Sequence, residues 1–375
     1  MAGIYVHIPF CKQACHYCDF HFSTNTRLKA SMLQAIAQEL LLRRDYLGDV
    51  PVRSVYLGGG TPSLLEPFLL ETLLKLINQH FSLQEAVEVT LEANPDDITL
   101  ARLRAWKAMG INRLSIGVQS FQDHVLRYLN RVHDGPGAVA SVKLAQQAGF
   151  DNLSIDLMYA IPGASQIMWE ADLAMALQLQ PTHLAAYCLT IEKNTVFGRW
   201  RERGRLKVVG EEVAAQQFEV LVAMMAMHQY EHYEVSNFSL PGCYAQHNTN
   251  YWKQGYYLGL GPGAHSYDGG TRQYNVAHNQ RYIDSLQQGV VPCTVEVLTP
   301  KDHVNEYVMT RLRTQWGCDM AWLKARYGYD LVQSKSIYLE RLVDHGLAVM
   351  NGQKLLLTRR GKLLADQIAT DLFVD

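Results

Sequence analysis

Three cysteines near the N-terminus have the spacing that most clearly indicates chemistry. Cys11, Cys15 and Cys18 are spaced C-x3-C-x2-C and directly follow a short, mainly apolar run, residues 4–10. Cysteine thiolates bind iron–sulfur clusters, and a [4Fe–4S] cluster normally takes four such ligands. Three ligands would leave one iron open to a small chelating molecule. The spacing therefore predicts a cluster with one open iron.

A zinc site is the alternative interpretation of the same cysteines. Structural zinc usually takes four Cys or His ligands in paired C-x2–4-C form, and His7, His16 or His21 could complete such a set. We favour the cluster, because a zinc site would leave the rest of the chain to be explained separately.

The composition limits the class of protein. The 375 residues have a formal net charge of −2, without the basic excess of nucleic-acid-binding domains, so we expect no nucleic-acid partner. Seven cysteines, of which three are clustered and four scattered, do not form the pattern of a secreted disulfide framework. We see no signal peptide and no apolar run of about 18 residues, and so expect a cytoplasmic protein without a transmembrane segment.

Short β-branched runs alternate with amphipathic stretches through the first two thirds of the chain, as in parallel βα units. We expect strands over residues 3–8, 54–59, 87–93, 113–119, 152–159 and 183–190. Helices are expected over residues 27–44, 67–80, 100–109, 123–130, 137–148 and 169–179. Six strand–helix repeats fit a partial (β/α)6 barrel, and also an open doubly wound sheet.

Polar residues stand at the carboxyl ends of successive strands, where parallel α/β folds gather their chemistry. They are the G-G-G-T-P run at 58–62, Glu92 with Asn94, Gln119 with Ser120, Asp156, and Tyr187. One such residue alone can be a helix cap or chance. Their recurrence on five strands predicts a single site and favours the barrel.

The glycine run at 58–60 would let backbone N–H groups approach a ligand closely. It is not followed by G-K-[ST], and it does not begin a G-x-G-x-x-G motif, so we expect no nucleotide phosphate there. Taken alone, the run also fits a tight strand-to-helix turn.

Several motifs together resemble the oxygen-independent coproporphyrinogen III oxidase-like family of radical S-adenosylmethionine (SAM) proteins. They are Y-V-H-I-P-F-C at 5–11, G-G-G-T-P at 58–62, G-V-Q-S-F at 117–121, L-N-R at 129–131 and I-D-L-M-Y at 155–159. The resemblance covers almost the whole chain. It implies a radical SAM partial barrel over residues 1–235, with a [4Fe–4S] cluster on Cys11, Cys15 and Cys18 and SAM at the open iron.

The same resemblance implies which residues line the SAM site. They are Tyr5, Gly59, Gly60, Thr61, Glu92, Gln119, Arg131 and Asp156. These residue types suit the ligand, because SAM offers a cationic sulfonium and an amine to Glu92 or Asp156 and a carboxylate to Arg131.

Two departures from the oxidase pattern indicate a particular branch of the family. The oxidases have a further cysteine two residues after the third ligand, where this chain has Phe20, and a long arm before the first ligand, where it has ten residues. Both features resemble the heme chaperones of the family, which lack oxidase activity. That resemblance implies no catalytic residue and a protein that binds heme and delivers it to acceptor heme proteins, among them membrane respiratory enzymes. The alternative is radical decarboxylation of coproporphyrinogen III.

The run H-N-T-N-Y-W at 247–252 matches the H-N-x-x-Y-W signature of those chaperones. Histidine is the commonest axial ligand of heme iron, and Tyr251 and Trp252 are suited to pack on a flat porphyrin. The resemblance therefore assigns heme to His247, with His265 as the competing ligand and Cys243 as a weaker third. From the residues alone, His247 equally fits a loop cap whose aromatic neighbours belong to the core.

Residues 236–298 are expected to be a connecting segment that contains this motif, and residues 299–375 a C-terminal domain. Helices over 320–327 and 334–344 precede strands at 347–350 and 354–357 joined by an Asn-Gly turn, an order that resembles a winged helix. Residues 319–375 contain eight Lys or Arg against seven Asp or Glu, which favours packing or partner docking over DNA binding. The sequence leaves open whether the chain forms a homodimer.

Overall fold

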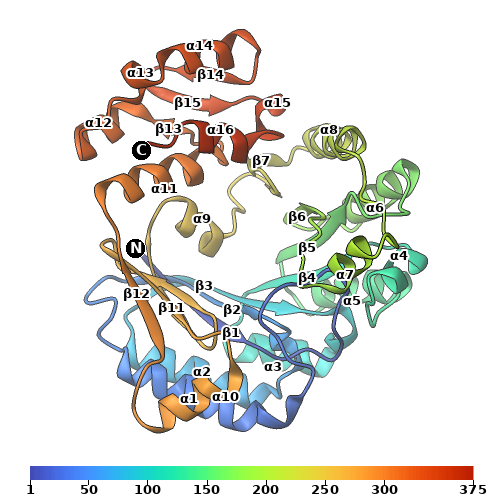
Figure 1. Ribbon diagram of the computed structural model, residues 1–375. Helices are drawn as coiled ribbons and strands as arrows, with labels where there is room; N and C mark the ends of the chain where they lie inside the picture. Colours follow the sequence, from blue (N-terminus) through green and yellow to red (C-terminus); the bar gives the residue numbers. More distant parts are fainter. Residues whose placement is uncertain (375) are drawn as a thin grey trace.

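The computed structural model describes residues 1–374 as a curved sheet layered with helices and a smaller C-terminal domain (Figure 1). Six parallel strands form the centre of the sheet and are hydrogen-bonded in chain order. They are β1 Ala2–Ile8, β2 Val52–Gly59, β3 Leu83–Ala93, β4 Arg113–Gln119, β5 Asn152–Tyr159 and β6 His183–Cys188. This arrangement confirms the predicted α/β partial barrel, since a closed barrel would pair its first and last strands.

Helices connect these strands in the order that the sequence predicts. They are α1 Lys29–Leu42, α2 Pro67–His80, α3 Leu100–Ala108, α4 Asp123–Tyr128, α5 Gly135–Gln147 and α6 Gln166–Gln178, and α7 Val196–Glu202 and α8 Glu211–Met227 follow β6. The predicted ends shift by a few residues: the strand expected over 183–190 ends at Cys188, and a short 3-10 turn, η1 Thr26–Leu28, precedes α1. No helix within residues 1–374 combines the length and apolar character needed to cross a bilayer.

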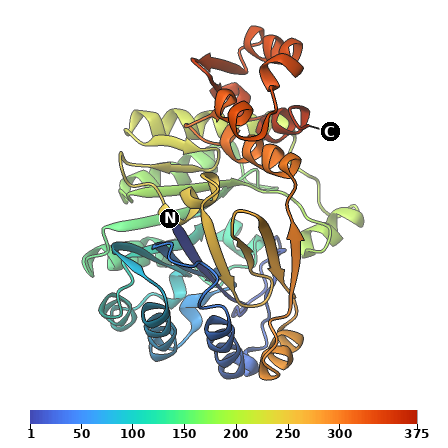
Figure 2. The same cartoon turned by 90° about the vertical axis from the view of Figure 1, so that its left-hand side faces the viewer.

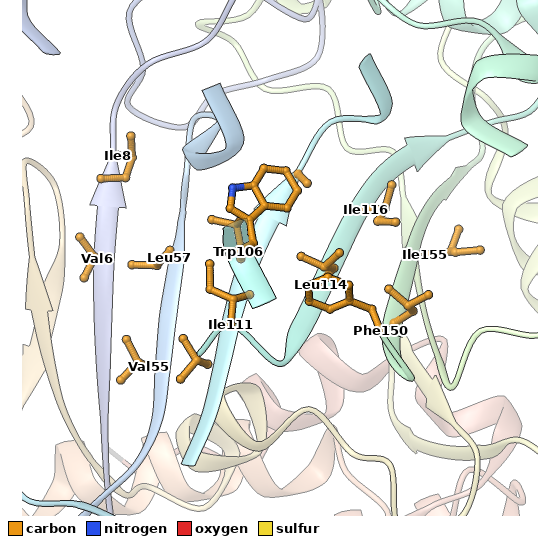
Figure 3. Packing of buried hydrophobic residues seen from close by; sticks show 14 of the residues in the cluster. Val6, Ile8, Val55, Leu57, Trp106, Ile111, Leu114, Ile116, Phe150 and Ile155 are labelled. Carbon is orange, nitrogen blue, oxygen red and sulfur yellow. The ribbon is translucent and has the colours of Figure 1, made fainter. Parts of the chain in front are cut away.

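Successive side chains of a strand point to opposite faces, and this alternation separates the core from the site. Figure 3 shows the apolar face, where Val6, Val55, Leu57 and Leu114 pack with Trp106 of α3. Residues between them in the sequence face the inner side of the curve. Tyr56, Ser115, Gly117, Ser154 and Asp156 are examples that line a cavity there.

Residues 236–298, expected to be a connecting segment, instead add strands to both edges of the same sheet. β8 Asn237–Ser239 pairs with β6 and with β7 Glu231–Glu234. β9 Tyr256–Leu260 pairs in parallel with β1, and β10 His265–Tyr267, β11 Thr271–Asn275 and β12 Cys293–Val297 continue antiparallel. α9 Gln246–Trp252 contacts β1, β2 and β9, and α10 Asn279–Gln287 packs on α1. These strands are short and lack clear alternation, so their pairing depends on the edges of the central sheet.

The C-terminal domain has the predicted helices and hairpin and its own apolar core, which includes Leu323, Leu342 and Leu355. Its elements are α11 Pro300–Leu312, β13 Cys318–Asp319, α12 Met320–Tyr327, α13 Leu331–Ser334, α14 Ser336–Asp344, β14 Ala348–Asn351, β15 Lys354–Leu357, α15 Arg359–Lys362 and α16 Ala365–Asp371. The strands pair in the order β13-β15-β14. Figures 1 and 2 both place this domain on the far side of the molecule from α1, α2 and α10.

The domain joins the barrel beside β7. The Nε of Arg313 donates to Glu234 Oε1 (3.1 Å), and the backbone of Val235 donates to Arg313 O (3.0 Å). The guanidinium of Arg313 also lies over the ring of Trp252 in α9, 5.7 Å from its centroid. α9 is therefore in contact with both parts of the molecule.

Candidate functional site

A cavity of about 450 Å³ opens at the carboxyl ends of the central strands. Its wall contains all three clustered cysteines and most of the residues predicted to hold SAM. These are Cys11, Cys15, Cys18, Gly59, Gly60, Thr61, Glu92, Gln119, Arg131 and Asp156. Tyr5 and His247 lie elsewhere. The structure therefore brings ten of the twelve predicted site residues to one cavity.

The cysteine loop follows β1 and is held in place by the L-N-R motif. The side chain of Gln13 donates to Asn130 Oδ1 (2.7 Å), and Asn130 Nδ2 donates in return to Ala14 O (2.7 Å). The backbone N–H of His16 donates to Leu129 O (3.1 Å), and Nη1 of Arg131 lies 3.4 Å from Cys15 Sγ. The motif thus positions the loop as well as contributing Arg131 to the cavity.

The three thiols are free and partly exposed, which suits iron–sulfur ligation. Burial raises the pKa of Cys11 to about 11 and the pKa of Cys18 to about 12. Both thiols are therefore protonated at neutral pH without metal, and iron binding would release their protons.

The histidines considered for zinc have other partners. Nε2 of His7 lies 2.8 Å from His21 O, Nδ1 of His16 lies 2.9 Å from Tyr128 O, and Nε2 of His21 lies 2.7 Å from Asn279 Oδ1. His16 and His21 each keep one ring nitrogen without a partner in the described residues, but of these candidate ligands only the thiols lie on the cavity wall, and three thiols are a donor set that would fit a cluster with one open iron.

The glycine run forms a close backbone cradle. Gly59 has φ = +109°, a value that favours glycine, and a Cβ there would lie 2.6 Å from His7 Nδ1. A Cβ on Gly60 would lie 2.7 Å from Phe10 O. Larger residues would therefore displace the end of β1 from the cavity wall.

Two carboxylates face the cavity from β3 and β5. Glu92 accepts hydrogen bonds from the Tyr56 hydroxyl (2.7 Å) and the Gly59 N–H (3.1 Å), and Asp156 accepts from Ser115 (3.1 Å) and Ser154 (3.0 Å). Burial raises the pKa of Glu92 to about 7 and also raises the pKa of Asp156. A cationic ligand would stabilise both ionised forms.

Gln119 and Arg131 complete this wall. The β4–β5 register shifts between Gly117 and Gln119, and Gln119 has φ = +68°, a strained value for a residue with a side chain. Nη2 of Arg131 donates to Asn94 Oδ1 and to Gly117 O, both at 2.7 Å, whereas its buried Nε has no partner in the described residues. That unpaired donor suits an anionic group of a bound ligand.

Arg113 is the main residue of the cavity that is missing from the predicted site. It lies at the start of β4, is 2% exposed, and forms an ion pair with Glu88, with 4.0 Å between Nε and Oε2. The sequence of the strand, R-L-S-I-G-V-Q, could have indicated Arg113, because its alternate positions R, S, G and Q share one face and Gln119 is already predicted to line the site.

His247, predicted as the axial ligand of heme, does not lie at an open surface. The residue is 2% exposed, Nδ1 lies 2.9 Å from Ser54 Oγ, and Nε2 lies 2.8 Å from the Tyr251 hydroxyl. Tyr5 lies beside it, with 6.2 Å between ring centroids. In this conformation both nitrogens are hydrogen-bonded, and neither is presented to a flat ligand.

The competing histidine has the opposite surroundings. His265 is exposed on β10, and its ring makes no hydrogen bond within residues 1–374. The ring of Tyr274 lies 5.6 Å away between centroids. Partial burial and the charge of Arg272 lower the pKa of His265, which favours the neutral form that binds metals. Cys243 is half-buried.

Comparison with known proteins agrees with this geometry. The radical SAM superfamily profile matches residues 5–176, and the HemN C-terminal domain profile matches residues 298–364. The heme chaperone HemW of Bacillus subtilis is 35% identical over 98% of this chain and 98% of its own length. The chain belongs to the HemW family. A HemW of Mycobacterium tuberculosis is 36% identical, covering 99% of this chain and 94% of its own.

A solved structure extends the match to the whole fold. Coproporphyrinogen III oxidase (HemN) from Escherichia coli, described as a radical SAM enzyme, superposes with a TM-score of 0.86. The match covers 100% of this chain and 90% of that one at 23% identity. This likeness shows that the two proteins share a fold. In this chain, Phe20 stands two residues after Cys18, where the oxidase pattern has a further cysteine, and it is 69% exposed beside the cavity.

Proposed function

We propose that this chain is a heme chaperone that carries a [4Fe–4S] cluster and SAM and passes heme to acceptor heme proteins, including membrane respiratory enzymes. The observation that supports the proposal is membership of the HemW family, because the similarity to proteins named heme chaperone HemW extends over nearly the whole length of both chains. We also propose that it works in the cytoplasm.

The cluster and SAM would occupy the cavity at the carboxyl ends of the strands. Cys11, Cys15 and Cys18 would hold the cluster, which when bound supplies an iron open to the amino and carboxylate groups of SAM. Glu92 and Asp156 would face the cationic parts of SAM. Arg131 would face its carboxylate with the Nε that has no protein partner among the described residues.

For heme, we propose His265 as the axial ligand in place of His247. An imidazole that binds iron must present a free nitrogen to a flat porphyrin. His265 is exposed without a hydrogen bond to its ring in the described chain, whereas both nitrogens of His247 are taken. Tyr274, 41% exposed, would stack beside the porphyrin, and Arg272 would face a propionate.

An anaerobic hemin titration of the cluster-reconstituted protein, followed by visible absorption, tests this proposal. We expect saturation at about one heme per chain with a ligand-shifted Soret band. His265→Ala should weaken binding by at least about tenfold, because the iron–nitrogen bond is lost. His247→Gln is the matched control and should retain the wild-type band. Absence of saturable binding by the wild type would overturn the chaperone, and an unchanged His265→Ala titration would overturn the ligand.

The fold shared with HemN favours one rival function, oxidation of coproporphyrinogen III. Anaerobic incubation with coproporphyrinogen III, SAM and a reductant separates the two functions. We expect no protoporphyrinogen IX, and its formation at a catalytic rate would replace the chaperone with the oxidase.

A further inference from the structure

We propose that His247 is a positioning residue for the SAM cavity, and that the H-N-x-x-Y-W segment, residues 247–252, forms the floor of the barrel beneath that cavity. This inference rests on the proposed SAM site. It assigns the segment a role that does not require contact with heme.

The segment is anchored from below the cavity by a buried carboxylate. Glu88 of β3, 3% exposed, accepts hydrogen bonds from the backbone N–H groups of Gln246 (3.0 Å) and His247 (3.2 Å). The same carboxylate lies 4.0 Å from Arg113, which lines the cavity. The start of α9 is therefore joined to a charged group of the cavity wall.

The His247 ring fills the space between the first two strands. It stacks on Tyr56, with 5.0 Å between centroids and 27° between planes. A Cβ on Gly3 would lie 3.1 Å from the ring atoms Cε1 and Nδ1. Both ring nitrogens are hydrogen-bonded, one as donor and the other as acceptor, to the hydroxyls of Ser54 and Tyr251, and these bonds fix the orientation of the ring. Because the packing is close on each side, a smaller side chain here would free Tyr56 to move.

Tyr56 connects the His247 ring to the carboxylate of Glu92, which faces the cavity. Its hydroxyl donates to Glu92 Oε1 (2.7 Å), and Glu92 Oε2 accepts from the Gly59 N–H (3.1 Å). A Cβ on Gly58 would lie 2.8 Å from the Tyr56 ring and 3.0 Å from Glu92 Oε1. The chain of contacts from His247 through Tyr56 to Glu92 and Gly59 is thus continuous and reaches the cavity wall.

The other residues of the motif also have roles in this structure. Asn248 lines the cavity, and Asn250 Nδ2 donates to Tyr256 O (2.9 Å), closing the turn after α9. Tyr251 holds His247, and Trp252 lies beneath Arg313 of the C-terminal domain. The signature therefore links the cavity floor to the C-terminal domain.

Equilibrium dialysis of SAM against the anaerobic, cluster-reconstituted protein tests the inference, with the EPR spectrum of the reduced cluster as a second readout. His247→Gln loses the ring stack and one hydrogen bond, so SAM affinity should fall by roughly three- to tenfold and the SAM-induced EPR change should diminish. His345→Gln, the same substitution at an exposed histidine of the C-terminal domain outside the cavity wall, is the matched control and should bind SAM as the wild type does.

A double-mutant cycle with Tyr56→Phe separates positioning from general destabilisation. Tyr56→Phe keeps the ring but removes the hydrogen bond to Glu92, so adding His247→Gln should produce little further loss of SAM affinity. Additive losses would overturn the route through Tyr56. Should His247→Gln fail to fold, Tyr251→Phe, which removes a single hydroxyl, tests the same route, with a loss of about threefold expected.

The outcomes also distinguish this inference from the function on which it rests. A wild-type protein that does not bind SAM would overturn the proposed SAM site, and the inference with it. Wild-type binding with unchanged affinity in His247→Gln would overturn the inference alone.

Discussion

The interior of the barrel and the strand extension β9–β12 each contain a candidate heme-binding histidine, and the two histidines differ in exposure and in hydrogen bonding. In the interior, His247 is enclosed by Ser54, Tyr56 and Tyr251, and both of its nitrogens are occupied. On the extension, His265 is exposed, with its ring beside Tyr274. The difference shows that a histidine within a signature motif can be a packing residue, because free donor atoms, rather than residue type, decide what can bind a metal.

The two regions also differ in charge. The interior contains the carboxylates of Glu92 and Asp156 and the buried guanidinium groups of Arg113 and Arg131, so it favours a zwitterionic ligand. The extension presents His265 near the cation of Arg272, which favours a ligand with a metal and an acidic side chain. One region therefore suits the proposed SAM and the other the proposed heme.

The largest expected effect is loss of the cluster from the barrel interior, with no change in heme binding on the extension. Cys11→Ser should abolish nearly all visible cluster absorption, because a hydroxyl does not replace a thiolate as an iron ligand. The far-UV circular dichroism and the hemin titration should stay as in the wild type, since His265 lies outside the cavity. Cys293→Ser on β12 is the control and should keep the cluster. An unfolded Cys11→Ser chain would instead assign the cysteines a structural role.

The next effect is a pH dependence confined to the interior. Burial, with a smaller contribution from the charge of Asp156, raises the pKa of Glu92 to about 7 against the opposing effects of Tyr56, Gly59 and Arg113. SAM should bind the ionised carboxylate, so its affinity should fall as the pH drops below 7, approaching about tenfold per pH unit.

The stability of the ligand-free chain should change with pH in the opposite direction. The folded-state pKa of Glu92 lies above the unfolded value, so its contribution is fully present below about pH 4.5 and is lost as the pH rises through about 7. SAM titrations and thermal melts from about pH 4.5, the ordinary pKa of a glutamate, to about one pH unit above 7 measure both slopes. Glu92→Gln is the control and should flatten them, and an equal slope in that variant would assign the titration to another group.

The smallest expected effect concerns the extension. Tyr274→Ala removes an aromatic neighbour of His265 but leaves the imidazole, so heme should bind about two- to tenfold more weakly, with an unchanged Soret position. SAM binding should stay the same. A shifted Soret band in this variant would indicate that Tyr274, rather than His265, contacts the iron.

Local patterns in the sequence predicted the central architecture and most of the cavity. The βα rhythm placed six strands and their helices, because hydrophobic periodicity is a local property that survives in the folded chain. The cysteine spacing and the polar residues at strand ends, such as Glu92 and Asp156, could be assigned to one site because parallel strands place their carboxyl ends together.

Only the tertiary structure decided the role of the remaining residues. The pairing of β9 with β1 made residues 236–298 part of the sheet, and this depends on an unpaired edge that is distant in sequence. The enclosure of His247 depends on Ser54, Tyr56 and Gly3, none of which is near it in the chain. Spacing and residue type determine which chemistry a chain can perform, whereas the occupancy of each donor atom is set by neighbours that only folding brings together.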